Sequence, residues 1–584
     1  MTTSQPEKPL LLAYRAKEER DQAYYDAIKA KFAEERELRL RYRPEGTKQY
    51  ITELQGELSR YEGDPYAPEV TPREPIVDTV EVLFIGGGFS ALLTSGRLRE
   101  RGVESIRIVE RGADVGGTWY WNRYPGIACD VVAYDYLPLL DETGYVPSRH
   151  YAGGQEIYEY CQMIARKYDL YDLAVFQTTV TSTTWNEAER LWEVTTDRGD
   201  HMKAQFVISA NGTLTKPKLA RINGMETFQG HSFHTSRWDY EYTGADLENL
   251  HDKVVGIIGT GATAVQAVPH LGAKAKELYV FQRTPSSIDV RDDWETDPEW
   301  AATLKPGWQA KRREKAFTEP PLTELQLERR KTFTPEEKLR AQENANIDYM
   351  MRIHRRIDEI VEDPATAEAL KPWYMFMCKR PCFHNDYLPT FNRPTVHLVD
   401  THGKGITEIG PDGPIFEGKT YKLDVLIYAT GFEVQKTGTW NVISGQDGLD
   451  LQVKYADGIR TLVGIHTAGY PNLFIMGGYQ ASFNFNLTDV LQAQGDHIAA
   501  CIDHVRSNGY RTIDCTPEAE EWWVQEVIDH RGKTNRNAEC TPGYYNFEGE
   551  FNRRQDGNYN GGFPKYYSHL GNVREHFDEY FRFG

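Results

Sequence analysis

The stretch VLFIGGGFSA, residues 82–91, decides the fold, and a second stretch of the same kind, VVGIIGTGATA, occupies residues 254–264. In each one, an apolar run typical of a buried strand leads into closely spaced glycine and alanine residues. Helical sequence follows at residues 92–101 and 265–271, where Pro269 is expected to kink or shorten the second helix. Each stretch therefore predicts a strand, a tight glycine turn and a helix in a βαβ unit, whose helix N-terminus favours a pyrophosphate group.

The residue 24 positions after Gly86 in the first stretch differs in charge from the residue 24 positions after Gly259 in the second. It is Glu110 after the first stretch and Arg283 after the second. An acid there accepts hydrogen bonds from both hydroxyls of an unmodified ribose, whereas an arginine suits a ribose 2′-phosphate. The sequence therefore predicts FAD or NAD at the first unit and NADP at the second, a pairing that describes a flavoenzyme reduced by NADPH. The alternative for each unit is an ordinary strand–turn–helix corner that binds no ligand.

Length and composition indicate a multidomain globular protein. The chain has 584 residues, more than one hydrophobic core usually supports, and 40% of them are hydrophobic. No run approaches the length of a transmembrane helix, and the N-terminus lacks the features of a signal peptide. Seven scattered cysteines predict neither a metal site nor a disulfide framework, and they favour a cytoplasmic location. The net charge of −19 disfavours nucleic acid and anionic membranes as partners, so an NADP site must be locally basic.

We predict an α/β fold class, with two Rossmann-like dinucleotide-binding domains and an inserted helical lobe. Strand-like runs lie at residues 191–196 and 205–209, charged helical sequence spans 293–371, and strands return at 396–400 and 423–428. The predicted division is an N-terminal helical extension and linker (1–75), the FAD-binding domain in two parts (76–213 and 431–584, the latter with substrate loops), the NADP-binding domain in two parts (214–284 and 378–430), and the helical insertion (285–377).

Two longer signatures fix several residue types at fixed spacing. One is GGTWYWNRYPGIACD at residues 116–130, and the other is FQGHSFHTSRWD at 228–239, which fits the pattern F-x-G-x-x-x-H-x-x-x-W-[P/D]. From about residue 80 to its end, the chain resembles the type I Baeyer–Villiger monooxygenases. The resemblance implies an enzyme that uses FAD, NADPH and O2 to insert one oxygen atom next to a ketone carbonyl through a C4a-peroxyflavin, giving an ester or lactone.

The resemblance also implies roles for individual residues. Arg380 would be catalytic, because a permanently charged guanidinium can stabilise both an anionic peroxide and the oxyanion of the adduct. Asp130 would be catalytic by holding that guanidinium near the flavin. His234 and Trp238 would couple the domains rather than act as an acid or a base. Without the signatures, a Lys379–Arg380 pair would be typical of a solvated surface, but the apolar flank at 373–377 argues against this.

The remaining predicted site residues surround the cofactors and the substrate. Arg283, Thr284 and Lys379 would bind the 2′-phosphate. The predicted cofactor-binding set is Gly86, Gly88, Ser90, Ala91, Glu110, Gly117, Thr118, Trp119, Asp130, Tyr136, Val180, Gly259, Thr260, Gly261, Ala262, Thr263, Ala264, Gln266, Arg283, Thr284 and Lys379. Phe483, Phe485 and Tyr544 are predicted to line the substrate site.

The substrate class is predicted by analogy. Residues 477–486 resemble the family's substrate-lining loop, and residues 540–546 resemble its mobile lid over the nicotinamide. With the N-terminal extension, the lid resembles the subgroup that takes bulky cyclic, macrocyclic or steroid-like ketones. One alternative is a flavin monooxygenase that oxygenates nitrogen or sulfur, which would not need the Asp130–Arg380 pair. Another is an NADPH-dependent flavin reductase, which would leave the 228–239 signature unexplained. The predicted partners are a small ketone and O2, and the oligomeric state is left open.

Overall fold

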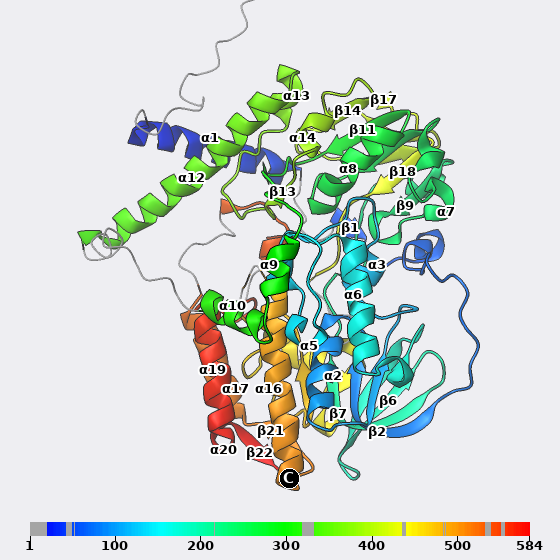
Figure 1. The fold of residues 1–584 in the computed structure, drawn as a ribbon. Helices are drawn as coiled ribbons and strands as arrows, with labels where there is room; N and C mark the ends of the chain where they lie inside the picture. The colour runs from blue at the N-terminus through cyan, green and yellow to red at the C-terminus, as the bar shows by residue number, and fades with distance from the viewer. Residues whose placement is uncertain are drawn as a thin grey trace, which may run out of the picture.

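The computed structural model of the protein describes residues 20–42, 49–51, 53–214, 216–317, 332–434, 440–482, 484, 486–531, 539–549 and 555–584 (Figure 1). Two separate sheets each contain the strand that leads into one glycine stretch. The first sheet lies in the lower half of the view and the second in the upper half. The predicted α/β fold with two dinucleotide-binding units is thus confirmed.

The first sheet has eight strands in the order β19-β5-β6-β7-β2-β3-β4, and β20 also pairs with β7. The strand β2 pairs in parallel with β3 and β7, and the helix α2 (Phe89–Glu100) packs against α16 (Leu487–Ser507) and α6 (Gly154–Lys167). The strands are β2 (Val77–Ile85), β3 (Ile106–Val109), β4 (Ala174–Val175), β5 (Val180–Asn186), β6 (Leu191–Thr196), β7 (His201–Ser209), β19 (Ile443–Ser444) and β20 (Leu473–Ile475).

The second sheet has five parallel strands in the order β14-β11-β10-β18-β9. The strands are β9 (His231–His234), β10 (Val254–Ile258), β11 (Glu277–Gln282), β14 (Val396–Asp400) and β18 (Val425–Tyr428). The helix α8 (Ala262–Lys274) continues through Pro269, so the expected shortening does not occur. Val265, Val268 and Leu271 of this helix are buried in the core beside the sheet, and this packing outweighs the local cost of the proline.

The glycine that directly follows each of the two strands has a conformation that favours glycine. The φ angles are 106° at Gly86 and 118° at Gly259. A Cβ atom on Gly259 would lie 2.4 Å from the carbonyl oxygen of Ala429, which is too close for any side chain. Both turns therefore form as the sequence predicts, because only glycine satisfies the backbone angle and the close approach together.

The inserted helical sequence packs in two places. The helices α9 (Pro298–Thr303) and α10 (Trp308–Phe317) lie beside the half of the molecule that is built on the first sheet. There Arg313 pairs with Asp489 of α16 at 3.0 Å. The helices α12 (Pro335–Ile360) and α13 (Pro364–Ala369) lie beside the second half (Figure 1).

The N-terminal extension is anchored to the second half of the molecule. The helix α1 (Gln22–Arg41) buries Tyr24, Ile28 and Phe32 against α12. Farther along, β1 (Tyr50–Ile51) pairs antiparallel with β8 (Leu219–Ala220). Residues Tyr24 and Ile28 are completely buried. The described residues of the extension, from residue 20 onward, therefore include a helix and a strand that pack on the body of the protein.

Smaller elements connect these parts. They are α3 (Thr118–Trp121), α4 (Ala133–Tyr136), α5 (Leu140–Thr143), α7 (Tyr240–Thr243), β12 (Ile288–Asp289), β13 (Cys382–Phe383), α14 (Tyr387–Thr390), β15 (Glu408–Gly410), β16 (Gly413–Phe416), β17 (Lys419–Thr420), α15 (Leu451–Lys454), β21 (Ile513–Cys515), α17 (Pro517–Asp529), α19 (Phe563–Glu575), α20 (Phe577–Tyr580) and β22 (Phe581–Phe583). Within the described part of the chain, no helix combines the length and apolar character that crossing a membrane requires.

A disulfide corrects one expectation from the sequence. Cys378 and Cys540 are bonded, with their Cα atoms 5.1 Å apart, although 162 positions separate them in the chain. The spacing of cysteines in the sequence gives no signal for such a pair, because only the tertiary fold brings the two segments together. The bond ties the segment just before Lys379 and Arg380 to the start of the predicted lid at residues 540–546.

Candidate active site

A cavity of about 1960 Å³ lies between the two halves and is lined by residues from both. The predicted site residues that line it are Thr118, Trp119, Asp130, Tyr136, Gly259, Thr260, Gly261, Ala262, Thr263, Gln266, Arg283, Thr284, Lys379, Arg380 and Tyr544. Among the predicted residues that the structure describes, Gly86, Gly88, Ser90, Ala91, Glu110, Gly117, Val180, Ala264, His234 and Trp238 lie outside this lining. The fold thus brings most of the predicted residues to one cavity.

Asp130 and Arg380 are in direct contact, although 250 positions separate them in the sequence. Arg380 Nη2 donates a hydrogen bond of 3.1 Å to Asp130 Oδ2. The side chain of Asp130 is 9% exposed, whereas that of Arg380 is 50% exposed and its exposed surface faces the cavity. The pair therefore presents a guanidinium to the cavity and holds it from behind with a buried carboxylate.

A second arginine, which the sequence did not predict, binds the same carboxylate. Arg291 Nη1 donates to Asp130 Oδ1 at 2.9 Å, and its Nη2 donates to the carbonyl oxygen of Cys129 at 2.7 Å. Burial raises the pKa of the Asp130 carboxyl, and the charges of Arg380 and Arg291 oppose that rise. Burial lowers the pKa of Arg380, but Asp130, together with Cys382, Tyr545 and Tyr124, outweighs this effect and raises the pKa, so the guanidinium stays charged. No motif around Arg291 marked it in advance.

The first glycine loop is closely packed and presents backbone atoms rather than side chains. Gly88 caps α2 without a side-chain hydrogen bond, and a Cβ on Gly117 would lie 2.9 Å from the Cα of Gly88. Glu110 is buried, and its two carboxylate oxygens accept hydrogen bonds from the backbone N–H groups of Gly87 at 2.6 Å and Gly112 at 2.7 Å. An uncapped helix N-terminus beside an ordered acid fits the diphosphate and ribose of a dinucleotide.

Of three further residues predicted near the first cofactor, two line the cavity and one does not. Trp119 donates from Nε1 to the hydroxyl of Tyr136 at 3.0 Å, and burial keeps the pKa of that hydroxyl well above its usual value. Both residues line the cavity. Val180, by contrast, is the first residue of β5, and its side chain packs in a hydrophobic core.

The second glycine loop has room at its helix N-terminus. Gly261 caps α8 without a side-chain hydrogen bond, and a Cβ placed on it would meet no atom within 4 Å. The hydroxyl oxygen of Thr284 is buried and has no hydrogen-bond partner among the described residues. An open helix N-terminus and an unsatisfied buried hydroxyl fit a bound pyrophosphate and a further phosphate group.

The predicted cations of this second site already have protein partners. Arg283 donates from Nη1 to Gln49 Oε1 and from Nη2 to the hydroxyl of Tyr50, both at 3.0 Å. Lys379 Nζ donates to the carbonyl oxygen of Pro542 at 2.9 Å, which links it to the predicted lid. Sequence reasoning missed Gln49 and Tyr50, because they belong to the N-terminal extension and carry no recognisable motif.

His234 and Trp238 are buried near the connections between the halves. His234 Nδ1 contacts the hydroxyl of Ser236 at 2.8 Å, and its ring lies 5.8 Å from that of Phe432, which pairs with Pro217 across the two connecting segments. Burial lowers the pKa of His234 to about 3, so its ring is neutral. Trp238 Nε1 donates to the hydroxyl of Thr243 at 3.1 Å. A domain-coupling role for both residues stays a prediction.

Of the three predicted substrate-lining residues, Phe483 and Phe485 lie outside the described residues. Tyr544 is 47% exposed and lines the cavity. Burial raises the pKa of its hydroxyl, and the charge of Arg380 opposes this rise. The beginning of the predicted lid therefore lies near the Arg380 side of the cavity.

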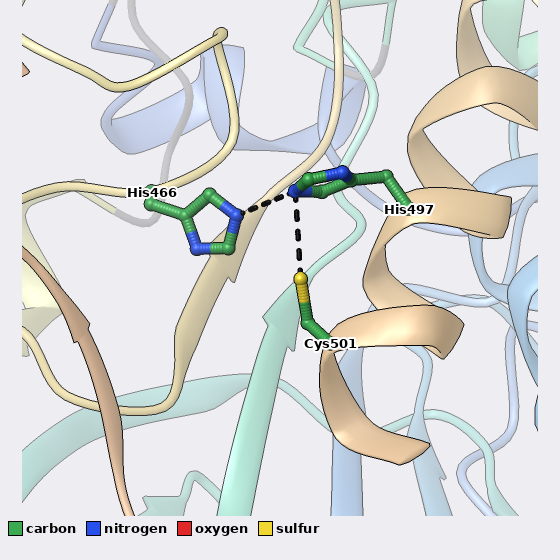
Figure 2. A group of neighbouring side chains, drawn as sticks. All are labelled: His466, His497 and Cys501. Atoms are coloured by element: carbon green, nitrogen blue, oxygen red, sulfur yellow. Dashed lines mark hydrogen bonds between the residues drawn. The ribbon is translucent and has the colours of Figure 1, made fainter. Parts of the chain in front are cut away.

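A buried cluster of two histidines and a cysteine lies away from this cavity (Figure 2). His466 and His497 are joined through their Nε2 atoms at 3.0 Å, and Cys501 Sγ lies 3.5 Å from His497 Nε2. Burial lowers the pKa of His466 to about 3 and raises the pKa of the Cys501 thiol. The three side chains form a hydrogen-bonded cluster in the core, and the prediction that the chain has no metal site stays a prediction.

Comparisons with known proteins agree with this geometry. The profile of the family described as pyridine nucleotide-disulphide oxidoreductase matches residues 83–338. The chain is 44% identical to neopentalenolactone D synthase of Streptomyces avermitilis, over 90% of this chain and 93% of that protein. It is 42% identical to Baeyer–Villiger monooxygenase ATR8 of Stachybotrys chlorohalonatus, over 91% of this chain and 89% of that protein.

The solved structures give the same result. The structure of polycyclic ketone monooxygenase from the thermophilic fungus Thermothelomyces thermophila is similar with a TM-score of 0.87 and 34% identity, and the match covers 96% of this chain and 99% of that one. Both the sequence signatures and the long matches to named relatives point to one group of enzymes. The chain belongs to the type I Baeyer–Villiger monooxygenase family.

Proposed function

We propose that this protein is an FAD- and NADPH-dependent monooxygenase that inserts one atom of O2 next to the carbonyl of a bulky polycyclic ketone, giving an ester or a lactone. The observation that carries the proposal is the contact between Asp130 and Arg380 at a cavity shared by both nucleotide-binding halves. Family membership favours this reaction over the oxygenation of nitrogen or sulfur. A reductase without oxygenation would not explain this ion pair, in which a buried carboxylate holds a half-exposed guanidinium at the cavity.

The residues of the chain have separate tasks in this reaction. FAD, when bound, would supply the chemistry with O2, and NADPH would supply the reducing equivalents. The first glycine loop and Glu110 would hold FAD, and the second loop with Arg283 and Thr284 would hold NADPH. Arg380 stabilises negative charge that develops on the carbonyl oxygen of the ketone, because its charge is permanent and its position is fixed before the substrate arrives. Asp130 and Arg291 provide that fixed position.

The names of relatives support a bulky substrate. A structural relative is named for polycyclic ketones, and a protein of Aspergillus clavatus, 40% identical over 90% of this chain, is named ketocytochalasin monooxygenase. We therefore propose a ketone carried on a fused-ring or macrocyclic skeleton, consistent with the resemblance of the N-terminal extension and lid to the subgroup that takes such ketones.

The proposal is tested by incubating the FAD-loaded protein with NADPH, ¹⁸O2 and a panel of ketones that ranges from cyclohexanone to fused-ring and macrocyclic compounds. The expected product is a lactone or an ester that carries one ¹⁸O atom, in the ring oxygen of the lactone or in the singly bonded oxygen of the ester. A parallel panel of amines and sulfides tests the alternative. Labelled N-oxides or sulfoxides without any labelled ester would refute the proposed reaction.

A further inference from the structure

The N-terminal extension reaches the wall of the cavity next to the second glycine loop. In β1, Tyr50 pairs with Ala220 of β8, and the backbone N–H of Arg221 donates to the carbonyl oxygen of Gln49 at 2.8 Å. Leu54 and Tyr61, a few residues farther along, are buried in the core behind the second sheet. This backbone anchoring holds the side chains of Gln49 and Tyr50 in the cavity lining.

Gln49 and Tyr50 both orient the guanidinium of Arg283. Each accepts one hydrogen bond from it at 3.0 Å, Gln49 through Oε1 and Tyr50 through its hydroxyl. These bonds use two of the five N–H donors that an arginine carries. The other three can bind a phosphate group while the protein contacts fix the plane of the guanidinium.

The contact with Arg283 also determines which way the Gln49 amide faces. A guanidinium can only donate, so the oxygen of Gln49 must face Arg283 and its amino group must face away. That amino group, Nε2, is buried and has no hydrogen-bond partner among the described residues, like the hydroxyl of Thr284. Two unsatisfied polar groups, on two residues that line the same cavity, are costly unless a ligand with several acceptor oxygens binds there.

Further positive charge surrounds the same place. The Nζ atom of Lys218 lies 4.0 Å from the centre of the Tyr50 ring, and Lys404 also lines the cavity. A Cβ on Gly405 would lie 3.3 Å from Cδ of Arg283, so that glycine leaves room for the arginine stem. In a chain of net charge −19, Arg283 and Lys218 give this part of the cavity wall a positive charge that suits an anionic group, whereas Lys404 forms an ion pair with Glu417 at 2.9 Å.

We propose that Gln49 and Tyr50 of the N-terminal extension form part of the binding site for the 2′-phosphate of NADPH, and that they help to set the preference for NADPH over NADH. Gln49 donates to a phosphate oxygen through Nε2, and Tyr50 positions Arg283 for its own contact. The inference rests on the proposed function for the identity of the coenzyme.

Calorimetric titration of the FAD-loaded, full-length protein with 2′,5′-ADP and with 5′-ADP tests this inference without any turnover. Gln49→Leu is expected to weaken binding of 2′,5′-ADP about tenfold or more, because it removes a hydrogen bond to a charged group, and to leave binding of 5′-ADP unchanged. Tyr50→Phe is expected to act in the same direction with a smaller effect. Arg283→Ala is the positive control and should show the largest loss.

Gln55→Leu is the matched control, since it makes the same chemical change at an exposed position of the same extension. It should bind both ligands as the wild type does. Equal losses for 2′,5′-ADP and 5′-ADP in the Gln49 and Tyr50 variants would overturn the inference and leave these residues a purely structural role. Unchanged binding of 2′,5′-ADP in both variants would also overturn it. The proposed function fails separately, through the absence of labelled ester with the wild-type enzyme.

Discussion

The guanidinium of Arg291 lies 2.9 Å from Asp130 Oδ1, on the opposite carboxylate oxygen from the one that Arg380 contacts. The Arg291 side chain is 11% exposed and is also held by the carbonyl oxygen of Cys129, whereas the Arg380 side chain is half exposed to the cavity. Arg291 is thus the more buried partner of the carboxylate, and Arg380 is the partner whose guanidinium is presented to the cavity.

The first prediction concerns Arg380. Arg380→Ala should still bind FAD and still be reduced by NADPH, but ester formation should fall by about 10²–10³, because a preorganised partner for the oxyanion is lost. Oxygen should still be consumed slowly, with hydrogen peroxide as the product. Arg380→Lys should recover little activity, since a compact ammonium cannot contact the substrate and Asp130 together. Stopped-flow reduction followed by product analysis separates these steps, and near-normal ester formation by the alanine variant would contradict the assignment.

Arg291→Ala should produce a milder defect with a distinct pH dependence. Burial already raises the pKa of Asp130, and Arg291 opposes that rise. Without Arg291 the carboxyl should ionise only at higher pH, so the acidic limb of the pH profile of ester formation should shift to higher pH. Arg355→Ala, which removes an exposed arginine that pairs with Glu359 within α12, serves as a control. An unshifted acidic limb would show that Arg291 does not act through Asp130.

The purified protein should show the visible absorption bands of oxidised flavin, and this should depend on Glu110. Both carboxylate oxygens of Glu110 accept backbone N–H groups, so Glu110→Ala leaves two buried donors unsatisfied at about 1–3 kcal/mol each. We expect this variant to lose most of its FAD during purification and to unfold at a lower temperature. Retention of a full complement of FAD would contradict the predicted role of the acid.

Acid should destabilise the protein through its buried histidines. Burial lowers the pKa of His354 to about 4, from an ordinary value of 6.5. The folded state keeps this ring neutral while the unfolded chain takes up a proton below pH 6.5, so the stabilisation is complete above pH 6.5 and declines as the pH falls toward 4. The loss is about 1.4 kcal/mol per pH unit for such a group. In urea unfolding at pH 7 and pH 5, His354→Gln should lose about 2 kcal/mol less than the wild type between the two pH values, and equal losses would argue against this account.

The disulfide makes a prediction that a thiol count can test. Seven cysteines are present, and those at 129, 161, 382, 501 and 515 are unbonded. Denatured, unreduced protein should therefore titrate as five thiols and as seven after reduction. Cys378→Ala combined with Cys540→Ala should lower stability by about 2–4 kcal/mol, because a cross-link across 162 positions restricts the unfolded chain. Seven thiols without reductant would contradict the pairing.

Much of the fold could be predicted because its signals are local. The glycine stretches at 82–91 and 254–264 fix strand, turn and helix within a few positions, since the backbone angles at Gly86 and Gly259 favour glycine. Glu110 and Arg283, which carry opposite charges, likewise lie the same number of residues after Gly86 and Gly259. The helix α8 runs through Pro269 without the expected shortening, because its buried face gains more from packing on the sheet than the proline costs locally.

The sequence by itself determined the two nucleotide-binding units, the family and the identity of Asp130 and Arg380 as candidates, because these depend on residue types at short, fixed spacing. Only the tertiary structure decided that Arg291 shares the carboxylate of Asp130, that Gln49 and Tyr50 hold Arg283, and that Cys378 bonds to Cys540. Each of these contacts joins segments more than a hundred residues apart. Such pairs leave no local pattern, since their proximity arises from the packing of whole elements rather than from the geometry of neighbouring residues.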